Sequence, residues 1–411
     1  MHDIESSDNS NFDPKIWYFF IFSVLFLSIM RGIRFPNVWS YTHFLFNYDF
    51  GFTKRGLIGE ILNKLNDSYL MTYDFFLIFS AVIFFMNIIL ISLLLKNLID
   101  SRKSVFIGCS LVFSSSLAVV FLSHSIGYFD HIGLLIALIT QKISGFYRKI
   151  IFLFISMPFA LLIHEAILII FFPVIFMSLL FSIEKKDFVI KKITILSFFS
   201  ASMFLLTLLI SNYNLEKSEA YEMHDNLQAS IRFSLRKDAF NVLHRDSKDN
   251  FQLMKNAWLK NKNRFLELTP SILATAPTIA IFIYFSILLL KKSKTDIYLI
   301  VLSVLAALSP LLLHFFGWDM HRWNTLTITT SFIMLNIAYS SKLKNQPTMT
   351  LNLTTSNHIY PAFIFIIFLN GASSIPLFDG YRVEQFPFIE HQKYVFDLIR
   401  GRETFPNVPS R

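Results

Sequence analysis

Long apolar stretches alternate with short polar ones along most of this chain, which is the pattern of a polytopic membrane protein. Most of these stretches, as helices, are long enough to cross a hydrocarbon core of ~30 Å. Two are shorter, which is typical of helices that line a cavity inside a protein instead of facing lipid. The pattern predicts an all-α transmembrane helical bundle of about 11 spans, at residues 16–35, 73–95, 104–123, 130–142, 149–163, 166–183, 193–212, 271–290, 296–314, 323–340 and 357–378.

Basic residues collect in every second short loop between these segments. The opposite short loops, at 124–131, 164–165 and 315–322, hold only Arg322. The positive-inside rule therefore places the N-terminus in the cytoplasm and the C-terminal tail outside. This orientation depends on the number of spans, because one span more or fewer would move some loops to the other side. The basic loops hold Lys96, Arg102, Lys103, Lys142, Arg148, Lys149, Lys185, Lys186, Lys191, Lys192, Lys291, Lys292, Lys294, Lys342 and Lys344.

The topology divides the chain into tails, loops and a bundle. Residues 56–65 of the first outer loop carry apolar side chains on one helical face, which predicts an amphipathic helix lying in the membrane interface. We find no internal repeat and no soluble enzyme domain. The predicted parts are a cytoplasmic tail (1–15), a transmembrane bundle (16–378) with its first outer loop (36–72) and a large outer loop (213–270), and an outer tail (379–411).

Composition agrees with this class of protein and excludes others. Hydrophobic residues make up 54% of the 411 residues, which few soluble domains reach. The net charge of +9 is explained by the basic loops, so we interpret it as topology and expect no nucleic-acid partner. The single cysteine, Cys109, excludes an intramolecular disulfide and a thiolate metal site. No cleavable signal peptide is evident, so the first apolar segment is expected to stay as an anchor.

Charged residues that are costly to keep beside a membrane occur in four compact groups. Each group caps an apolar segment, and the predicted topology brings all four to the outer face. Ionisable groups at the mouth of a membrane bundle are candidates for function. The groups lie at 49–56, 130–131, 164–165 and 319–323.

The first group combines a carboxylate with two adjacent cations. Asp49 is a candidate general base for an acceptor hydroxyl, and Lys54 and Arg55 are candidate phosphate ligands. The alternative is structural, with Asp49 in a turn and the two cations at a lipid headgroup boundary. Both interpretations stay open at this level.

The second and third groups differ in how readily a structural role explains them. Asp130 precedes His131 at the start of an apolar segment, where an aspartate also makes a good helix cap. His164 and Glu165, in contrast, stand between two strongly apolar stretches with almost no loop to solvate them. An ionised glutamate in that setting needs a cation or a donor, which favours a functional role.

The fourth group gathers residues that can bind a sugar, a diphosphate or a divalent cation. Asp319, His321 and Arg322 are followed by Trp323, and Trp318 precedes them. The tryptophans could stack on a sugar face or belong to the interfacial aromatic belt. Three histidines and several carboxylates permit a metal site without requiring one, so the cofactor stays unknown, with a divalent cation possible and no metal ligand assigned.

The acidic first outer loop, the amphipathic helix after it and the charged groups that cap later spans resemble the GT-C class of glycosyltransferases. The likeness is architectural and maps that family's acidic residue of the first loop to Asp49, although the usual second acid is replaced by Phe50 and Gly51. The chain is also similar in layout to O-antigen polymerases of the Wzy type. That resemblance would give a substrate-binding role to basic residues of the large outer loop, Arg232, Arg236 and Arg245.

Both resemblances imply an enzyme that transfers glycosyl groups from a polyprenyl-(di)phosphate-linked sugar donor to a glycan acceptor. We therefore expect a multi-pass enzyme of the bacterial inner membrane that acts in surface polysaccharide assembly, where other assembly proteins are candidate partners. In this hypothesis Asp49, Glu165, His164 and Asp319 act in catalysis. The substrate-binding residues would be Lys54, Arg55, Asp130, His131, His321, Arg322 and Trp323. The alternative is a transporter or flippase of lipid-linked sugars, which would distribute polar residues through the membrane and show repeat symmetry.

Overall fold

The computed structural model describes residues 13–65, 68–183, 189–231, 234–260, 263–345, 359–378 and 381–383. These residues form helices and loops, with one isolated bridge between Pro376 and Arg382 and no strand, so the predicted all-α fold is confirmed. Two shorter apolar helices accompany six that are long and apolar enough to cross a membrane. The six are Tyr73–Asp100, Ser104–His124, Phe146–Ile163, Val189–Asn212, Arg264–Lys292 and Ile297–Phe315.

Every predicted apolar segment coincides with one helix or with two consecutive ones. Where a segment is divided, the break falls at polar or kinked positions, such as Ser115 and Ser116 between α5 and α6. The helices of the bundle are α1 (Pro14–Met30), α4 (Tyr73–Asp100), α5 (Ser104–Ser114), α6 (Leu117–His124), α7 (Asp130–Lys142), α8 (Phe146–Ile163), α9 (Ile167–Ile170), α10 (Phe172–Leu180), α11 (Val189–Asn212), α15 (Asn263–Lys292), α16 (Ile297–Leu308), α17 (Met320–Asn345) and α18 (Ile359–Ala372).

Helix α17 lies at the centre of the bundle, although its hydropathy is the lowest among the long helices. It packs against α15, α16, α6 and α10. Its buried threonine hydroxyls donate hydrogen bonds to backbone carbonyl oxygens and so remain satisfied inside the bundle. Thr327 donates to Trp323 O at 2.8 Å, and Thr330 donates to Ala307 O at 2.6 Å. The first turn of α17 carries Arg322, so this packing fixes the position of that side chain.

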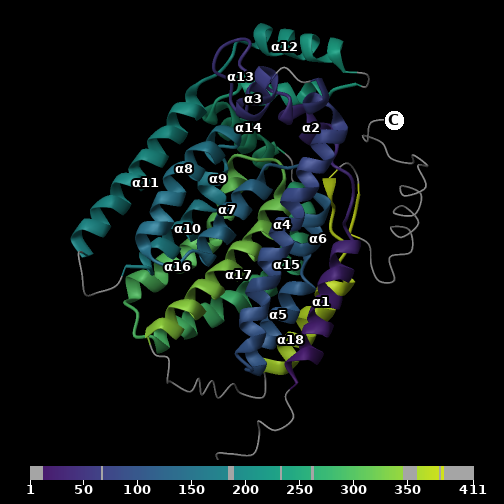
Figure 1. Ribbon diagram of the computed structural model, residues 1–411. Helices are drawn as coiled ribbons and strands as arrows, with labels where there is room; N and C mark the ends of the chain where they lie inside the picture. The colour runs from purple at the N-terminus through teal and green to yellow at the C-terminus, as the bar shows by residue number, and fades with distance from the viewer. Residues whose placement is uncertain are drawn as a thin grey trace, which may run out of the picture.

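Short helices cover one end of the bundle, the upper end in Figure 1, which we call the cavity end. The predicted amphipathic helix is α3, which buries Ile58 and Leu62. Gly59 allows α3 to lie against the chain before it, because a Cβ there would stand 2.1 Å from the Phe46 carbonyl oxygen. The covering elements are α2 (Val38–Phe44), α3 (Leu57–Leu65), α12 (Lys217–Ser230), α13 (Asn241–His244), α14 (Ser247–Lys260) and the 3₁₀ turns Ser68–Met71, Lys237–Phe240 and Ser309–Phe315.

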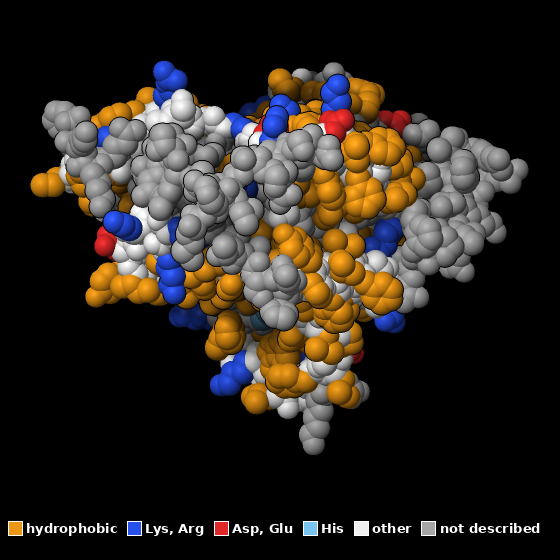
Figure 2. All heavy atoms as spheres, turned by 90° about the horizontal axis from the view of Figure 1, so that it is seen from below, with side chains coloured by type: hydrophobic (Ala, Val, Ile, Leu, Met, Phe, Trp, Pro, Cys, Tyr) orange, Lys and Arg blue, Asp and Glu red, His pale blue; other side chains and the backbone are white. Residues whose placement is uncertain are grey.

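Basic residues of the described short loops, such as Arg102, Lys103 and Lys291, lie at the opposite end of the bundle. Helices α4, α7 and α15 run away from the cavity end and finish near Asp100, Lys142 and Lys292. Figure 2 shows this opposite face, where Lys and Arg side chains are spread around hydrophobic ones. The asymmetry of charge predicted along the chain is therefore an asymmetry between the two ends of the fold.

Candidate functional site

The structure brings residues of the four charged groups together in one chain of ion pairs, whose two parts are joined by the His164 imidazole. The chain begins with Arg55, whose Nη2 lies 2.6 Å from Glu165 Oε1 and whose Nε lies 3.1 Å from Glu165 Oε2. His164 follows, with Nδ1 3.7 Å from Glu165 Oε2 and Nε2 3.8 Å from Asp130 Oδ1. Arg322 closes it, with Nε 2.6 Å from Asp130 Oδ2 and Nη1 3.1 Å from Asp319 Oδ2.

An interrupted helix places His164 and Glu165 at the centre of this chain. Helix α8 ends at Ile163, and His164 adopts an extended conformation with φ −159° before α9 begins at Ile167. The interruption directs both side chains into the interior. The sequence places these residues between apolar runs because the runs are two helices that meet at the site.

Arg55 reaches Glu165 from a backbone conformation that non-glycine residues seldom adopt. Its φ is +62°, in the left-handed region. Such strain persists only where the surrounding structure over-determines it, and it occurs often at functional sites. Here the two hydrogen bonds of the guanidinium to Glu165 hold the strained residue in place.

The pair of Asp130 and Arg322 is the most deeply buried part of the chain. Their side chains are 3% and 7% exposed, and both guanidinium Nε and Nη2 contact the carboxylate. The Arg322 guanidinium also lies 5.0 Å from the ring centre of Tyr128 and 4.8 Å from that of Trp323. A buried charge pair held in this way fixes the relative positions of α7 and α17.

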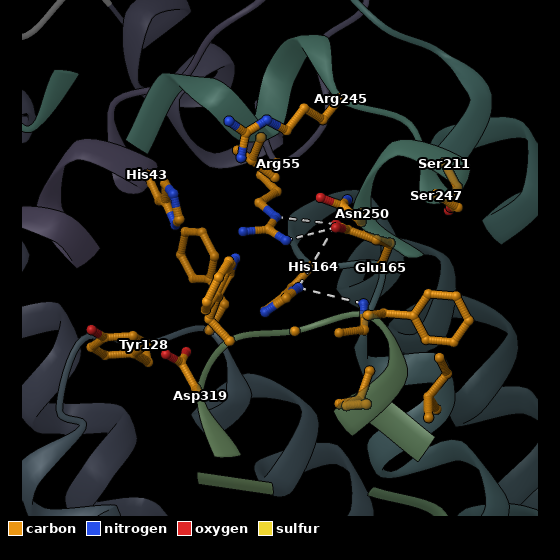
Figure 3. A pocket seen from close by; sticks show the side chains of 18 of the residues that line it. His43, Arg55, Tyr128, His164, Glu165, Ser211, Arg245, Ser247, Asn250 and Asp319 are labelled. Carbon is orange, nitrogen blue, oxygen red and sulfur yellow. Dashed lines mark hydrogen bonds and ion pairs between the residues drawn. The ribbon is translucent and has the colours of Figure 1, made fainter. Parts of the chain in front are cut away.

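A cavity of about 670 Å³ lies beside this chain of ion pairs. Figure 3 shows Arg55, His164 and Glu165 facing it, with Arg245 on the same side and Tyr128 and Asp319 across from them. One wall is apolar and comes from α9 and α11. The charged and aromatic members of the lining are Trp39, His43, Arg55, Tyr128, Phe129, His164, Glu165, Phe204, Asp238, Arg245, Phe316, Trp318, Asp319, Arg322 and Trp323.

Neighbouring charges set the protonation of the central residues. Burial raises the pKa of the Glu165 carboxyl, but the Arg55 guanidinium and the contact with His164 outweigh burial and hold that pKa well below its ordinary value. Burial lowers the pKa of His164, and Arg55 lowers it further against the opposing effect of Glu165. At neutral pH the site therefore contains an ionised glutamate and a neutral imidazole.

This arrangement predicts a defined loss of stability in acid. Because the folded-state pKa of Glu165 lies below the ordinary 4.5, its pairing stabilises the fold above that pH. The stabilisation is lost as the pH falls through the lower folded-state value. We expect the melting temperature of the wild type in detergent to exceed that of Glu165→Gln near pH 7, and the difference to shrink only below pH 4.5. A difference that does not change with pH would contradict the assignment.

Lys54 serves the site indirectly. Its ammonium group donates to the Asn214 side chain and, at 2.7 Å, to the Arg245 carbonyl oxygen. Burial lowers the pKa of Lys54 to about 8. The residue therefore ties the first loop to the segment before α14, and it positions Arg245 instead of lining the cavity itself.

Arg245 differs from the other two arginines of the cavity lining in its ion pairing. Arg55 and Arg322 are paired with carboxylates, whereas the Arg245 guanidinium has no ion pair with any residue that the structure describes. A cation of this kind can accept the charge of an incoming anion without first breaking an internal pair.

Besides Lys54 and Asp130, three further predicted site residues lie outside the cavity lining. Asp49 is exposed, and its carboxylate accepts hydrogen bonds from Asn47 Nδ2 at 2.7 Å and Asn63 Nδ2 at 3.3 Å. His131 is buried between α4 and α7, where Asn87 donates to its carbonyl oxygen at 2.9 Å. His321 is partly buried in the first turn of α17 and is not part of the lining.

Sequence reasoning had not assigned a role to Trp39, His43 or Tyr128. Trp39 and His43 lie on α2, a helix too short to register as an apolar segment. The only sequence indication for Tyr128 was its position two residues before Asp130. In the structure it stacks on Phe378, with ring centres 4.7 Å apart. The four-residue spacing of Trp39 and His43, which puts both on one helical face, was the available indication.

No group of three or more His, Cys, Asp or Glu side chains in the described part of the chain is placed to hold a metal ion.

The chain matches no protein-family model, no curated protein and no solved structure. Its function is therefore argued from the cavity itself.

Proposed function

We propose that this protein is a membrane enzyme that transfers a glycosyl group from a polyprenyl-(di)phosphate-linked sugar to a glycan acceptor in the cavity. The observation that carries the proposal is a single cavity that joins an apolar wall, an available arginine and a partly exposed carboxylate. These three features correspond to the lipid, the diphosphate and the reacting hydroxyl. The proposal includes a GT-C-like bundle that crosses the bacterial inner membrane about 11 times, with the cavity end outside.

The apolar wall supports a substrate with a lipid tail. Phe204 and Leu208 of α11 line the cavity, and their side chains are 58% and 43% exposed. Helix α11 packs on α8, α9 and α10 and forms an outer edge of the bundle in Figure 1. A polyprenyl chain lying along α11 would reach the cavity directly from the hydrocarbon region, without its head group passing through the protein.

Arg245 is the proposed ligand of the diphosphate. Arg55 and Arg322, which the sequence had suggested for this part, are engaged by Glu165 and by Asp130 with Asp319. Their charges are largely neutralised inside the site. Among the arginines of the described lining, Arg245 alone adds a positive charge that is not already paired, and a planar guanidinium can contact a phosphate in two places.

Arg245→Gln should weaken binding of undecaprenyl diphosphate roughly 10- to 100-fold, because a hydrogen bond to a charged group contributes about 1.5–3 kcal/mol. The measurement is titration of the full chain in nanodiscs followed by native mass spectrometry. The control is Arg236→Gln, since Arg236 lies outside the cavity lining and its guanidinium is bonded to Asp238 at 2.9 Å. Equal binding by Arg245→Gln and the wild type would contradict the role of Arg245.

Asp319 is the proposed general base. Protonation of Glu165 would disrupt its double hydrogen bond with Arg55, whereas the Asp319 side chain, which contacts Arg322, is 39% exposed and can meet a substrate. The acceptor hydroxyl would attack the anomeric carbon and give its proton to Asp319. The bond from that carbon to the phosphate oxygen would break, and the departing diphosphate would remain on Arg245.

The two functional hypotheses differ in a direct assay. Purified protein in vesicles is supplied with a polyprenyl-diphosphate oligosaccharide, and the products are separated by mass. The proposal predicts a longer glycan or a modified acceptor together with free polyprenyl diphosphate. Movement of intact substrate between leaflets without bond formation would instead identify a transporter.

A further inference from the structure

Trp318 is a tryptophan fixed in place at the border of the cavity. Its side chain is 56% exposed, yet the Arg264 guanidinium lies 4.6 Å from its ring centre. Arg264 is 3% exposed and also lies 4.9 Å from the ring centre of Trp258, whose Nε1 donates to the His314 carbonyl oxygen at 3.1 Å. Cation–π contacts on both sides of Arg264 thus hold an exposed aromatic ring rigid.

The arginine behind Trp318 has no other strong partner. Its Nε has no hydrogen-bond partner among the described residues, and its nearest polar contact is Met254 Sδ at 3.9 Å. No carboxylate of the described residues forms an ion pair with Arg264, although the Glu267 charge acts on its guanidinium from further away. Its guanidinium lies between the rings of Trp258 and Trp318 and so fixes the orientation of the exposed Trp318 ring.

Trp318 borders two hollows at once. It lines the enclosed cavity and also an open hollow of about 660 Å³ that runs along α14. Arg245 is likewise shared by both linings. In the open hollow, α14 presents the amides of Gln252 and Asn256, which their four-residue spacing puts on one helical face beside Lys260.

We propose that this open hollow binds the glycan acceptor, with one sugar ring stacked on Trp318 and its hydroxyls bonded to Gln252 and Asn256. A pyranose offers an apolar C–H face and a rim of hydroxyls, which a fixed aromatic ring and side-chain amides recognise together. The assignment to the acceptor rests on the proposed function. It places the acceptor beside Asp319 and the donor diphosphate on the other side of Arg245.

The test measures saccharide binding separately from donor binding. Fluorescently labelled full-length protein in nanodiscs is applied to an array of defined bacterial oligosaccharides, and undecaprenyl diphosphate binding is measured on the same samples. Trp318→Ala should weaken saccharide binding about tenfold or more, because it removes the stacking face. Trp318→Tyr should retain most of the binding, and a control, Trp17→Ala on α1, should retain all of it.

The outcomes separate the two proposals. Saccharide binding that depends on Trp318, with lipid diphosphate binding unchanged in every variant, supports the acceptor site. If the wild type retains no glycan, or if Trp318→Ala retains as much as the wild type, the acceptor site is wrong even where lipid diphosphate binds. Saccharide binding could also depend on Trp318 while the protein neither binds lipid diphosphate nor transfers a glycosyl group. In that case the proposed function is wrong, and the open hollow is a saccharide-binding site without that function.

Discussion

Arg322→Met should destabilise the fold by roughly 3–5 kcal/mol, because it leaves the Asp130 carboxylate buried without its cation. The Asp130 side chain is 3% exposed, and His164, whose Nε2 lies 3.8 Å away, is neutral at pH 7 and does not replace the lost cation. The loss should appear as a lower melting temperature in detergent. It should be much larger than the effect of Arg236→Met, which breaks an exposed pair that contributes about 0–1 kcal/mol.

A double variant decides whether the loss comes from the orphaned charge. Asp130→Leu with Arg322→Met removes both partners, so most of the stability should return. If the double variant is as unstable as the sum of the two single variants, the loss comes from packing with Tyr128 and Trp323. The buried pair would then not be what holds α7 to α17.

Asp319→Asn should lower the turnover rate by about 10²–10⁴, the usual contribution of a general base. The amide keeps the size of the side chain and a contact with Arg322 but cannot take the proton of the acceptor hydroxyl. Binding of the polyprenyl-diphosphate donor should stay unchanged because Arg245 is intact. The measurement is the initial rate of glycan extension by purified protein at saturating donor.

The matched control for this prediction is Asp49→Asn. Asp49 was the carboxylate that the family resemblance favoured, but it is exposed and bonded to Asn47 and Asn63 outside the cavity lining. Its replacement should leave the rate unchanged. If Asp49→Asn abolishes turnover while Asp319→Asn does not, the base is on the first loop and the proposed chemistry is wrong.

Much of the fold could be predicted because apolar helices of a membrane protein are long and separated by polar loops. Every segment from 16–35 to 357–378 became a helix or a consecutive pair, and the amphipathic stretch 56–65 became α3. The number of helices that cross the membrane could not be predicted equally well. Helix α17 is buried in protein and bonded through its own threonines, so hydropathy alone does not describe it.

The convergence of the charged groups also followed from the sequence, whereas the roles of single residues did not. A lone Glu165 between apolar runs needs a cation, and the structure supplies Arg55. Nothing along the chain, however, distinguishes a paired arginine such as Arg322 from an available one such as Arg245. That difference arises because α14 and the segment before it fold over the cavity. The composition of a loop does not predict how the loop folds.

The most direct test of the central claim is a cryo-electron microscopy structure of the full chain in nanodiscs with undecaprenyl diphosphate. We expect the diphosphate inside the cavity, with an oxygen about 2.7–2.9 Å from the Arg245 guanidinium and the lipid chain along Phe204 and Leu208 of α11. Density for the diphosphate at any site outside this cavity, with the cavity empty, would contradict the account.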